Sequence, residues 1–334
     1  MYFVRLLFLL LLLSAFASAQ APAFDPGQYQ SADGAITLTP NGTEVEPYFA
    51  TKALIVAQDA GLDTHDTAVK WIAWMLPRQR SDGRIDRWCN KGDLWAQCGA
   101  ADADDSMLAL WTQLLYRNAT DQGLPLEWQQ SADKALAYER SLMSRWGTFY
   151  ISRKKHTSLF MDNVEIYSAF KDIGKQLSRW DLNGASTVDA QSQQLADAVT
   201  RVFWDQGAGR FRPSTQKSRA GFYPDAVGQT YPWLEGMPTP QDPQESWKVW
   251  KQQYGRGWLL ETYDPHPWGL VAVTAVKLND SSTAECWLQQ TTARRGGSSW
   301  NVLEEATFQA VQERVAQAKG ETQSASCNNL VSGQ

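Results

Sequence analysis

Acidic residues crowd the starts of several predicted helices, and this pattern could support acid–base chemistry. The densest example is CGAADADDSMLALW at 98–111, where Asp102, Asp104 and Asp105 directly precede an apolar helical run. Capping one helix needs only one carboxylate, so three carboxylates exceed that requirement. Crowded carboxyl groups repel one another, which raises the pKa of at least one of them, as a general acid requires.

Similar acids precede or begin other predicted helices, from the run at 47–60 onward. We select six of these carboxyl groups as catalytic candidates: Glu46, Asp104, Asp105, Asp162, Glu165 and Asp225. Asp264, Glu304 and Glu305 occupy comparable positions. For these three we favour helix capping, because an acid at a helix N-terminus satisfies free amides and complements the helix dipole.

The elements that must position these acids are helices in successive pairs. Glycine-containing turns, each with a following aromatic residue, recur at intervals of roughly 40 to 65 residues, which fits one helix pair per interval. The predicted helices are 47–60, 66–80, 103–117, 128–146, 163–178, 188–204, 226–236, 242–254, 267–278, 282–294 and 303–318. Strand signals are few and fit small loop hairpins.

This pattern predicts an all-α fold, an (α/α)6 toroid with odd helices in an inner ring and even helices in an outer ring. In a closed toroid the N-termini of the inner helices converge at one end, so acids distant in the sequence would meet around one cleft. An open helical solenoid is the alternative architecture. The predicted parts are a signal peptide at 1–19, an extended segment at 20–43, the toroidal catalytic domain at 44–319 and a polar tail at 320–334.

The N-terminus and the cysteines predict export. The first 19 residues contain one arginine, a short apolar run and a small-residue cleavage site, as in a signal peptide cleaved near Ala19. A retained anchor is the alternative, and no later stretch reaches a membrane-spanning length. In an exported chain, an even count of cysteines favours two disulfides, Cys89–Cys98 and Cys286–Cys327. We therefore expect a secreted or periplasmic monomer with no membrane association after cleavage.

Charge and motif content narrow the possible ligands. The formal net charge of −5 argues against general nucleic-acid binding. The spacing of Cys89 and Cys98 and the absence of a nearby histidine disfavour zinc. We expect neither a cofactor nor a metal site, although an acid cluster could hold Ca²⁺, which we leave open.

Paired carboxyl groups are the usual equipment of a glycosidase: one protonates the leaving oxygen, and the other activates water or attacks the sugar. Four segments, EPYFATKALIVA, ADADDSMLALW, MDNVEIYSAF and YPDAVGQTYPWL, follow one another in an order that resembles the six-hairpin (α/α)6-barrel glycosidases over most of residues 44–310. Glycoside hydrolase family 8 is the nearest named comparison, with a Glu just before an early inner helix and an ATDAD segment at the next one.

The resemblance implies roles for individual residues. Glu46 or Glu44 would match the general acid, although the chain has TEVEPYF where that family has SEGQGYG. Asp102 and Asp104 would match acids that grip the substrate. No motif identifies the base, for which Asp162, Glu165 and Asp225 remain candidates.

Basic and aromatic residues are frequent in the loops that lead into the predicted inner helices. Candidate substrate-binding residues are Asp102, Trp88, Arg153, His156, Tyr223 and Trp300. Aromatic faces suit sugar rings, and arginines suit carboxylates or sulfates. We therefore expect a polysaccharide or oligosaccharide substrate that is anionic, such as a uronate-containing polymer. The alternative is that these lysines and arginines form an ordinary solvated surface.

Three other functions fit parts of the sequence. A polysaccharide lyase would use a Tyr or His base, for which Tyr150, His156, Tyr223, Tyr263 and His266 are available. A class II terpene cyclase would use the D-x-D-D acid motif that Asp102, Asp104 and Asp105 match. A non-catalytic carbohydrate-binding or scaffold protein could have the same fold, because fold alone does not imply activity.

Overall fold

The structure is a computed structural model that describes residues 21–92, 94–217, 220–318 and 327. The predicted signal peptide lies outside the described residues, as does the predicted polar tail apart from Cys327. Within the described part of the chain, no helix combines the length and apolar character needed to cross a membrane.

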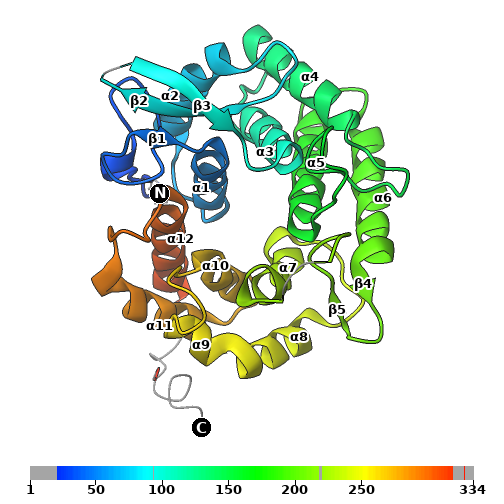
Figure 1. The fold of residues 1–334 in the computed structure, drawn as a ribbon. Helices are drawn as coiled ribbons and strands as arrows, with labels where there is room; N and C mark the ends of the chain where they lie inside the picture. Colours follow the sequence, from blue (N-terminus) through cyan, green and yellow to red (C-terminus); the bar gives the residue numbers. More distant parts are fainter. Residues whose placement is uncertain (1–20, 93, 218–219, 319–326, 328–334) are drawn as a thin grey trace, which may run out of the picture.

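Six helices form the inner ring of a closed toroid (Figure 1). They are α1 (Pro47–Asp59), α3 (Asp104–Arg117), α5 (Phe160–Arg179), α7 (Tyr231–Glu235), α10 (Gly269–Lys277) and α12 (Val302–Ala318). Each packs against the next, and α12 packs against α1, which closes the ring. The predicted all-α fold is confirmed, and closure excludes the open solenoid.

The remaining helices lie outside this ring or connect its members. They are α2 (His65–Met75), α4 (Leu126–Arg140), α6 (Ala185–Phe203), α8 (Pro243–Trp250), α9 (Arg256–Leu259) and α11 (Ser281–Thr291), with the short turns η1 (Gly27–Tyr29), η2 (Leu76–Arg78), η3 (Phe222–Ala226), η4 (Lys251–Gly255) and η5 (Thr292–Arg294). The predicted helix at 66–80 ends earlier, at Met75, because Pro77 lacks the amide that would continue the α-helical ladder.

Inner and outer helices differ in how much of their surface is buried. Every residue of α3 from Asp104 to Leu115 is buried, because α3 packs against two inner neighbours and against α4. In α6, by contrast, the buried residues include Leu195, Val199 and Phe203, spaced four apart on one face of the helix. One continuous core therefore lies between the rings and holds the inner helix starts in fixed relative positions.

The fold also contains two small sheets. The first has the antiparallel order β1 (Glu44–Val45), β2 (Asp86–Lys91) and β3 (Leu94–Ala100), and the second pairs β4 (Trp204–Asp205) with β5 (Arg210–Phe211). The six- and seven-residue strands of the first sheet lie in a segment predicted only as a loop. Both predicted disulfides are present: Cys89–Cys98 joins β2 to β3, and Cys286–Cys327 ties residue 327 to α11.

Candidate active site

The N-termini of the six inner helices meet at one end of the toroid, as predicted, and we call this the N-terminal end. The charge of Asp105 of α3 acts on Asp162 of α5, whose own charge acts on Tyr223, just before α7. Tyr223 stacks on Trp268, with ring centroids 4.7 Å apart, directly before α10. The amide of Gly269 then donates to Glu304 of α12. Acids separated by more than a hundred positions therefore share one end of the fold.

Asp105 and Asp162 form a carboxyl pair at the first turns of α3 and α5. Asp105 is fully buried, and its side chain lies within hydrogen-bonding reach of the Asp162 carboxyl group and of the backbone amides at the start of α3. Burial raises its pKa to about 7, and the charges of Asp104 and Glu165 act in the same direction. Burial also raises the pKa of Asp162 well above its ordinary value, as do the charges of Asp105 and Glu165. Two buried like charges close together are costly, so the pair holds at least one proton at neutral pH.

A third acid, Glu139 of α4, adjoins this pair from the outer ring. It is 1% exposed, and neither carboxylate oxygen has a partner within the described residues. Burial raises the pKa of Glu139 well above its ordinary value, and the charge of Asp105 adds to that effect. Glu139 is therefore held neutral, so it adds no negative charge beside Asp105. Sequence reasoning did not select it, because it lies near the C-terminus of an outer helix.

Glu165, another catalytic candidate, belongs to a buried ion-pair network. Its Oε1 lies 2.9 Å from Lys52 Nζ and accepts a hydrogen bond from the Tyr48 hydroxyl at 2.9 Å. Lys52 Nζ also lies 2.5 Å from Glu235 Oε1. Burial raises the pKa of Glu165, and the opposing charge of Lys52 limits the rise. With its lone pairs occupied in this way, Glu165 serves to hold α1, α5 and α7 together.

Glu46 and Asp104 also have defined partners. Glu46 precedes α1, is 3% exposed and forms an ion pair with Arg87 of β2. Asp104 accepts a hydrogen bond from the Tyr138 hydroxyl at 3.2 Å, and burial raises its pKa. Neither side chain caps its own helix.

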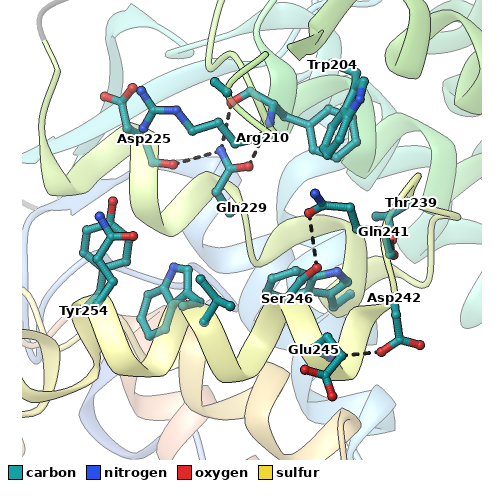
Figure 2. Close-up of a pocket in the computed structure, with 17 residues that line it drawn as sticks. Trp204, Arg210, Asp225, Gln229, Thr239, Gln241, Asp242, Glu245, Ser246 and Tyr254 are labelled. Carbon is teal, nitrogen blue, oxygen red and sulfur yellow. Dashed lines mark hydrogen bonds between the residues drawn. The ribbon is translucent and has the colours of Figure 1, made fainter. Parts of the chain in front are cut away.

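Asp225 lies apart from the carboxyl pair. It accepts a hydrogen bond from the amide of Gly221 at 3.0 Å and borders a cavity between the β4–β5 hairpin and α8. Figure 2 shows it beside Arg210 at one edge of that cavity. Of the six catalytic candidates, Asp225 is the one that borders this cavity.

The predicted substrate-binding residues occupy different environments. Asp102 and Tyr223 are exposed at the N-terminal end, near Asp162. Trp88 is half-buried against Trp74, and Trp300 is 1% exposed in the core, where its indole N–H donates to Glu305 at 3.0 Å. A side chain as buried as Trp300 offers no face to a ligand.

Arg153 and His156 share one exposed loop. The Arg153 guanidinium lies 4.1 Å above the Tyr138 ring, and its Nε donates to Ser141 Oγ at 2.8 Å. His156 stacks on Tyr150, with ring centroids 4.9 Å apart. The loop is therefore fixed by aromatic contacts, and its cationic groups remain at the surface.

The structure adds Glu304 to the candidates. Sequence reasoning favoured a cap for its own helix, but Asn301 supplies that cap, and Glu304 Oε2 instead accepts the Gly269 amide of α10 at 2.9 Å. A Cβ at position 269 would lie 2.7 Å from that oxygen, so glycine permits the approach. Burial raises the pKa of Glu304 to about 7. It differs from Glu305, whose carboxylate pairs with Arg295.

No group of three or more metal-ligating side chains that could hold an ion is found in the part of the chain that the structure describes. Asp105 and Asp162 adjoin each other, Glu46, Glu165 and Glu305 pair with cations, and Glu304 accepts a backbone amide. Carboxyl groups in these settings can transfer protons.

Comparisons with known proteins find solved structures that share this fold. No family model matches the sequence, and no curated protein matches it. A novel alpha-amylase from Clostridium perfringens matches in structure, with a TM-score of 0.60, 12% identity and coverage of 87% of this chain and 95% of that chain. A GH63 mannosylglycerate hydrolase from Thermus thermophilus, in complex with glucose, has a TM-score of 0.54, 11% identity and coverage of 85% and 96%. A D-mannose isomerase has a TM-score of 0.57, 13% identity and coverage of 88% and 94%.

At these identities the likeness shows a shared fold and leaves the reaction open. The shared architecture is the closed (α/α)6 toroid, and the resemblance to six-hairpin glycosidases, including glycoside hydrolase family 8, stays a prediction.

Proposed function

We propose that this protein is an exported glycoside hydrolase in which Asp162 is the general acid and Glu304 is the second catalytic carboxylate. The observation that carries the proposal is the buried Asp105–Asp162 pair, whose pKa values are raised, at one side of the N-terminal end, with Glu304, whose pKa is raised to about 7, at the other. The glycosidases that share the fold supply a consistent substrate class.

Elimination supports this choice of residues. Three buried or half-buried acids at the N-terminal end are neutralised by cations: Glu46 by Arg87, Glu165 by Lys52 and Glu305 by Arg295. Asp105 has no exposed surface, so it cannot touch a substrate. Asp104, Asp162 and Glu304 keep 9%, 9% and 7% of their surface exposed and form no ion pair in the described residues. Asp104 is set aside because its carboxylate accepts a hydrogen bond from the Tyr138 hydroxyl and lies in the field of Arg84.

The positions of α5 and α12 in the ring support the choice of these two carboxyl groups. α5 and α12 are the third and sixth inner helices, and they face each other across the ring (Figure 1). Between them, along the N-terminal end, lies the Tyr223–Trp268 stack, with half of the Tyr223 surface exposed. An exposed aromatic face is a platform for a sugar ring, which would hold the glycosidic bond between the two acids.

The reaction follows from these positions. Asp162 donates its proton to the glycosidic oxygen as the bond from that oxygen to the anomeric carbon breaks, and positive charge develops on the sugar. Glu304 then removes a proton from a water molecule that attacks the anomeric carbon. Alternatively, Glu304 attacks that carbon itself to form an ester, and water, deprotonated by the now ionised Asp162, breaks the ester and frees Glu304. Asp105 does not contact the sugar. Its role is to keep the pKa of Asp162 high enough for that residue to carry a proton at neutral pH.

The pH dependence should report Glu304, because both of its possible roles require the ionised form. Below its pKa of about 7, Glu304 is protonated, so kcat/KM should fall by about tenfold per pH unit toward acid. Glu304→Gln should lower kcat by about 10²–10⁴ and remove this acid limb from the residual activity. Initial rates across a pH series would measure both effects.

The matched control is Glu313→Gln. Glu313 also lies on α12, but well past its first turn, and its carboxylate accepts a hydrogen bond from Gln317. It should keep the wild-type rate and profile. A Glu304→Gln enzyme with unchanged rate and pH profile would rule out the proposed role of Glu304.

We further propose that the substrate is anionic and that the exposed loop at 152–156 recognises its charge. Four other arginines of the basic loops are ion-paired, to Asp82, Glu46, Glu261 and Glu305. Arg153, Lys154, Lys155 and His156 remain exposed, and their segment contains no acid.

Binding of a hexauronate should therefore weaken as salt rises from 0.05 to 0.5 M, roughly in proportion to the screening of exposed charges. The double variant Lys154→Gln, Lys155→Gln should lose most of this salt dependence, and binding of a neutral hexaose should be the same in both proteins. Equal, salt-independent binding of both sugars to the wild-type protein would contradict an anionic substrate. Calorimetric titration is a suitable measurement.

Product analysis separates hydrolysis from the other reactions that this fold supports. A hydrolase releases new reducing ends without ultraviolet absorption, whereas a lyase produces unsaturated ends that absorb. Burial and the charges of Asp162 and Asp102 raise the pKa of Tyr223 to about 12, which makes it a poor candidate for a lyase base at neutral pH. A protein that binds sugars and produces neither product would be a non-catalytic binding protein.

A further inference from the structure

A cavity of about 630 Å³ lies between the β4–β5 hairpin, η3, α8 and η4 (Figure 2). Its volume falls within the range of roughly 300–1,000 Å³ that small-molecule sites occupy. Neither Asp162 nor Glu304 borders it, so it is distinct from the acids of the proposed reaction.

Aromatic side chains form much of the cavity wall. Trp204 and Tyr254, both half-buried, lie toward opposite ends of the cavity in Figure 2. Trp250, which also lines the cavity, is buried, and its indole N–H donates to the carbonyl of Ala226 at 2.8 Å. Trp204 is steadied by an edge contact with Phe211, with ring centroids 4.9 Å apart. These rings are fixed before any ligand arrives, which keeps the entropic cost of binding low.

Hydrogen-bonding groups are spread between the rings. Gln241 and Ser246 interact with each other only weakly, at 3.5 Å, and both border the cavity. The Glu245 side chain is exposed there, and the indole N–H of Trp233 has no hydrogen-bond partner among the described residues. Fixed rings with adjacent amide, hydroxyl and carboxylate groups match the alternating apolar faces and hydroxyl edges of a sugar.

The charge of the lining discriminates between sugar classes. Asp225, Asp242 and Glu245 border the cavity, whereas Arg210 is the single basic residue among the lining residues. This excess of carboxylates repels uronates and sulfated sugars, while sugar hydroxyls can donate to carboxylates. We propose that the cavity binds a neutral saccharide unit at a site separate from the reacting bond. The proposal rests on the proposed function only in taking a carbohydrate as the ligand, and it does not depend on the catalytic residues or on the charge of the sugar at the reacting bond.

The test is direct binding, which needs no turnover. Wild-type protein and the variants Trp204→Ala and Gln241→Ala would be titrated calorimetrically with cellohexaose, xylohexaose, maltohexaose and mannohexaose, and with hexagalacturonate. The same titrations on Asp162→Asn prevent hydrolysis during the measurement. Trp146→Ala is the matched control, because Trp146 is 54% exposed and does not border the cavity. A thermal melt of each variant verifies folding.

At least one neutral hexaose should bind, and Trp204→Ala should weaken that binding by about tenfold or more, as for a central aromatic anchor. Gln241→Ala, an exposed and mild change, should weaken it severalfold, and Trp146→Ala should leave it unchanged. The proposal is overturned if no neutral hexaose binds, if both cavity variants bind it as the wild type does, or if hexagalacturonate binding shows the same sensitivity to Trp204. A failed hydrolase assay with intact, Trp204-dependent binding would overturn only the proposed function.

Discussion

Asp162→Asn is expected to abolish most of the hydrolytic activity, with kcat lowered by about 10²–10⁴. The amide has the shape of the carboxyl group but carries no proton acidic enough to transfer to the leaving oxygen. Folding should be preserved, because the change removes a buried carboxyl group that the charge of Asp105 repels, and the new amide can still hydrogen-bond to Asp105. Release of reducing ends and a denaturation curve measure the two properties separately.

A general acid has a signature that a merely structural residue lacks. Aryl glycosides with a good leaving group, such as 2,4-dinitrophenol, need little protonation, so Asp162→Asn should lose far less activity on them than on the polymer. Asp197→Asn, an exposed change on the outer helix α6, is the control and should behave as the wild type does. Equal losses on both kinds of substrate would assign Asp162 to binding or structure instead.

The fold was predictable because its main signals are local. Apolar periodicity and glycine turns placed all six inner helices, and the long periodic runs left little ambiguity about helix type. What the sequence did not show was the β2–β3 hairpin, whose residues are mostly half-buried or exposed and lack clean alternation. Its strands are stabilised by the Cys89–Cys98 disulfide and by pairing with β1, which are contacts between distant or covalently linked positions.

The crowding of carboxyl groups was predictable from the sequence, whereas the partners of individual side chains were not. The excess of charge at Asp102 to Asp105 correctly pointed to a place where carboxyl groups crowd together. Glu304 was assigned to capping because the sequence cannot show that Asn301 already fills that role. Trp300 was assigned to substrate because sequence cannot distinguish a tryptophan in a loop from one that turns into the core. Both errors, for Glu304 and Trp300, concern which residues a side chain contacts. Those contacts form only when helices distant in the sequence close into a ring.

Lys52 is the clearest case of a residue whose importance depends on closure, and Lys52→Met should cost about 3–5 kcal/mol of unfolding free energy. In the sequence it interrupts the apolar run of α1. In the structure it is 1% exposed between Glu165 of α5 and Glu235 of α7. Removing it leaves both acids buried without their cation. Lys175→Met is the matched control, because Lys175 is 70% exposed in its pair with Asp172, and it should change stability by about 0.5 kcal/mol or less.

The stability lost in Lys52→Met should depend on pH, and the direction of that dependence follows from the pKa of Glu165. Burial already raises its pKa, and Lys52 opposes the rise, so the pKa of Glu165 must rise further in Lys52→Met. A carboxyl group whose pKa is higher in the folded than in the unfolded state contributes its full share to the free energy of unfolding below the unfolded pKa, near 4.3. That contribution is lost as the pH rises to and through the folded pKa. Urea denaturation should therefore show a smaller deficit for Lys52→Met at pH 5 than at pH 8. A deficit that is constant across this range would mean that lost packing of the lysine stem, and not the unpaired acids, accounts for the instability.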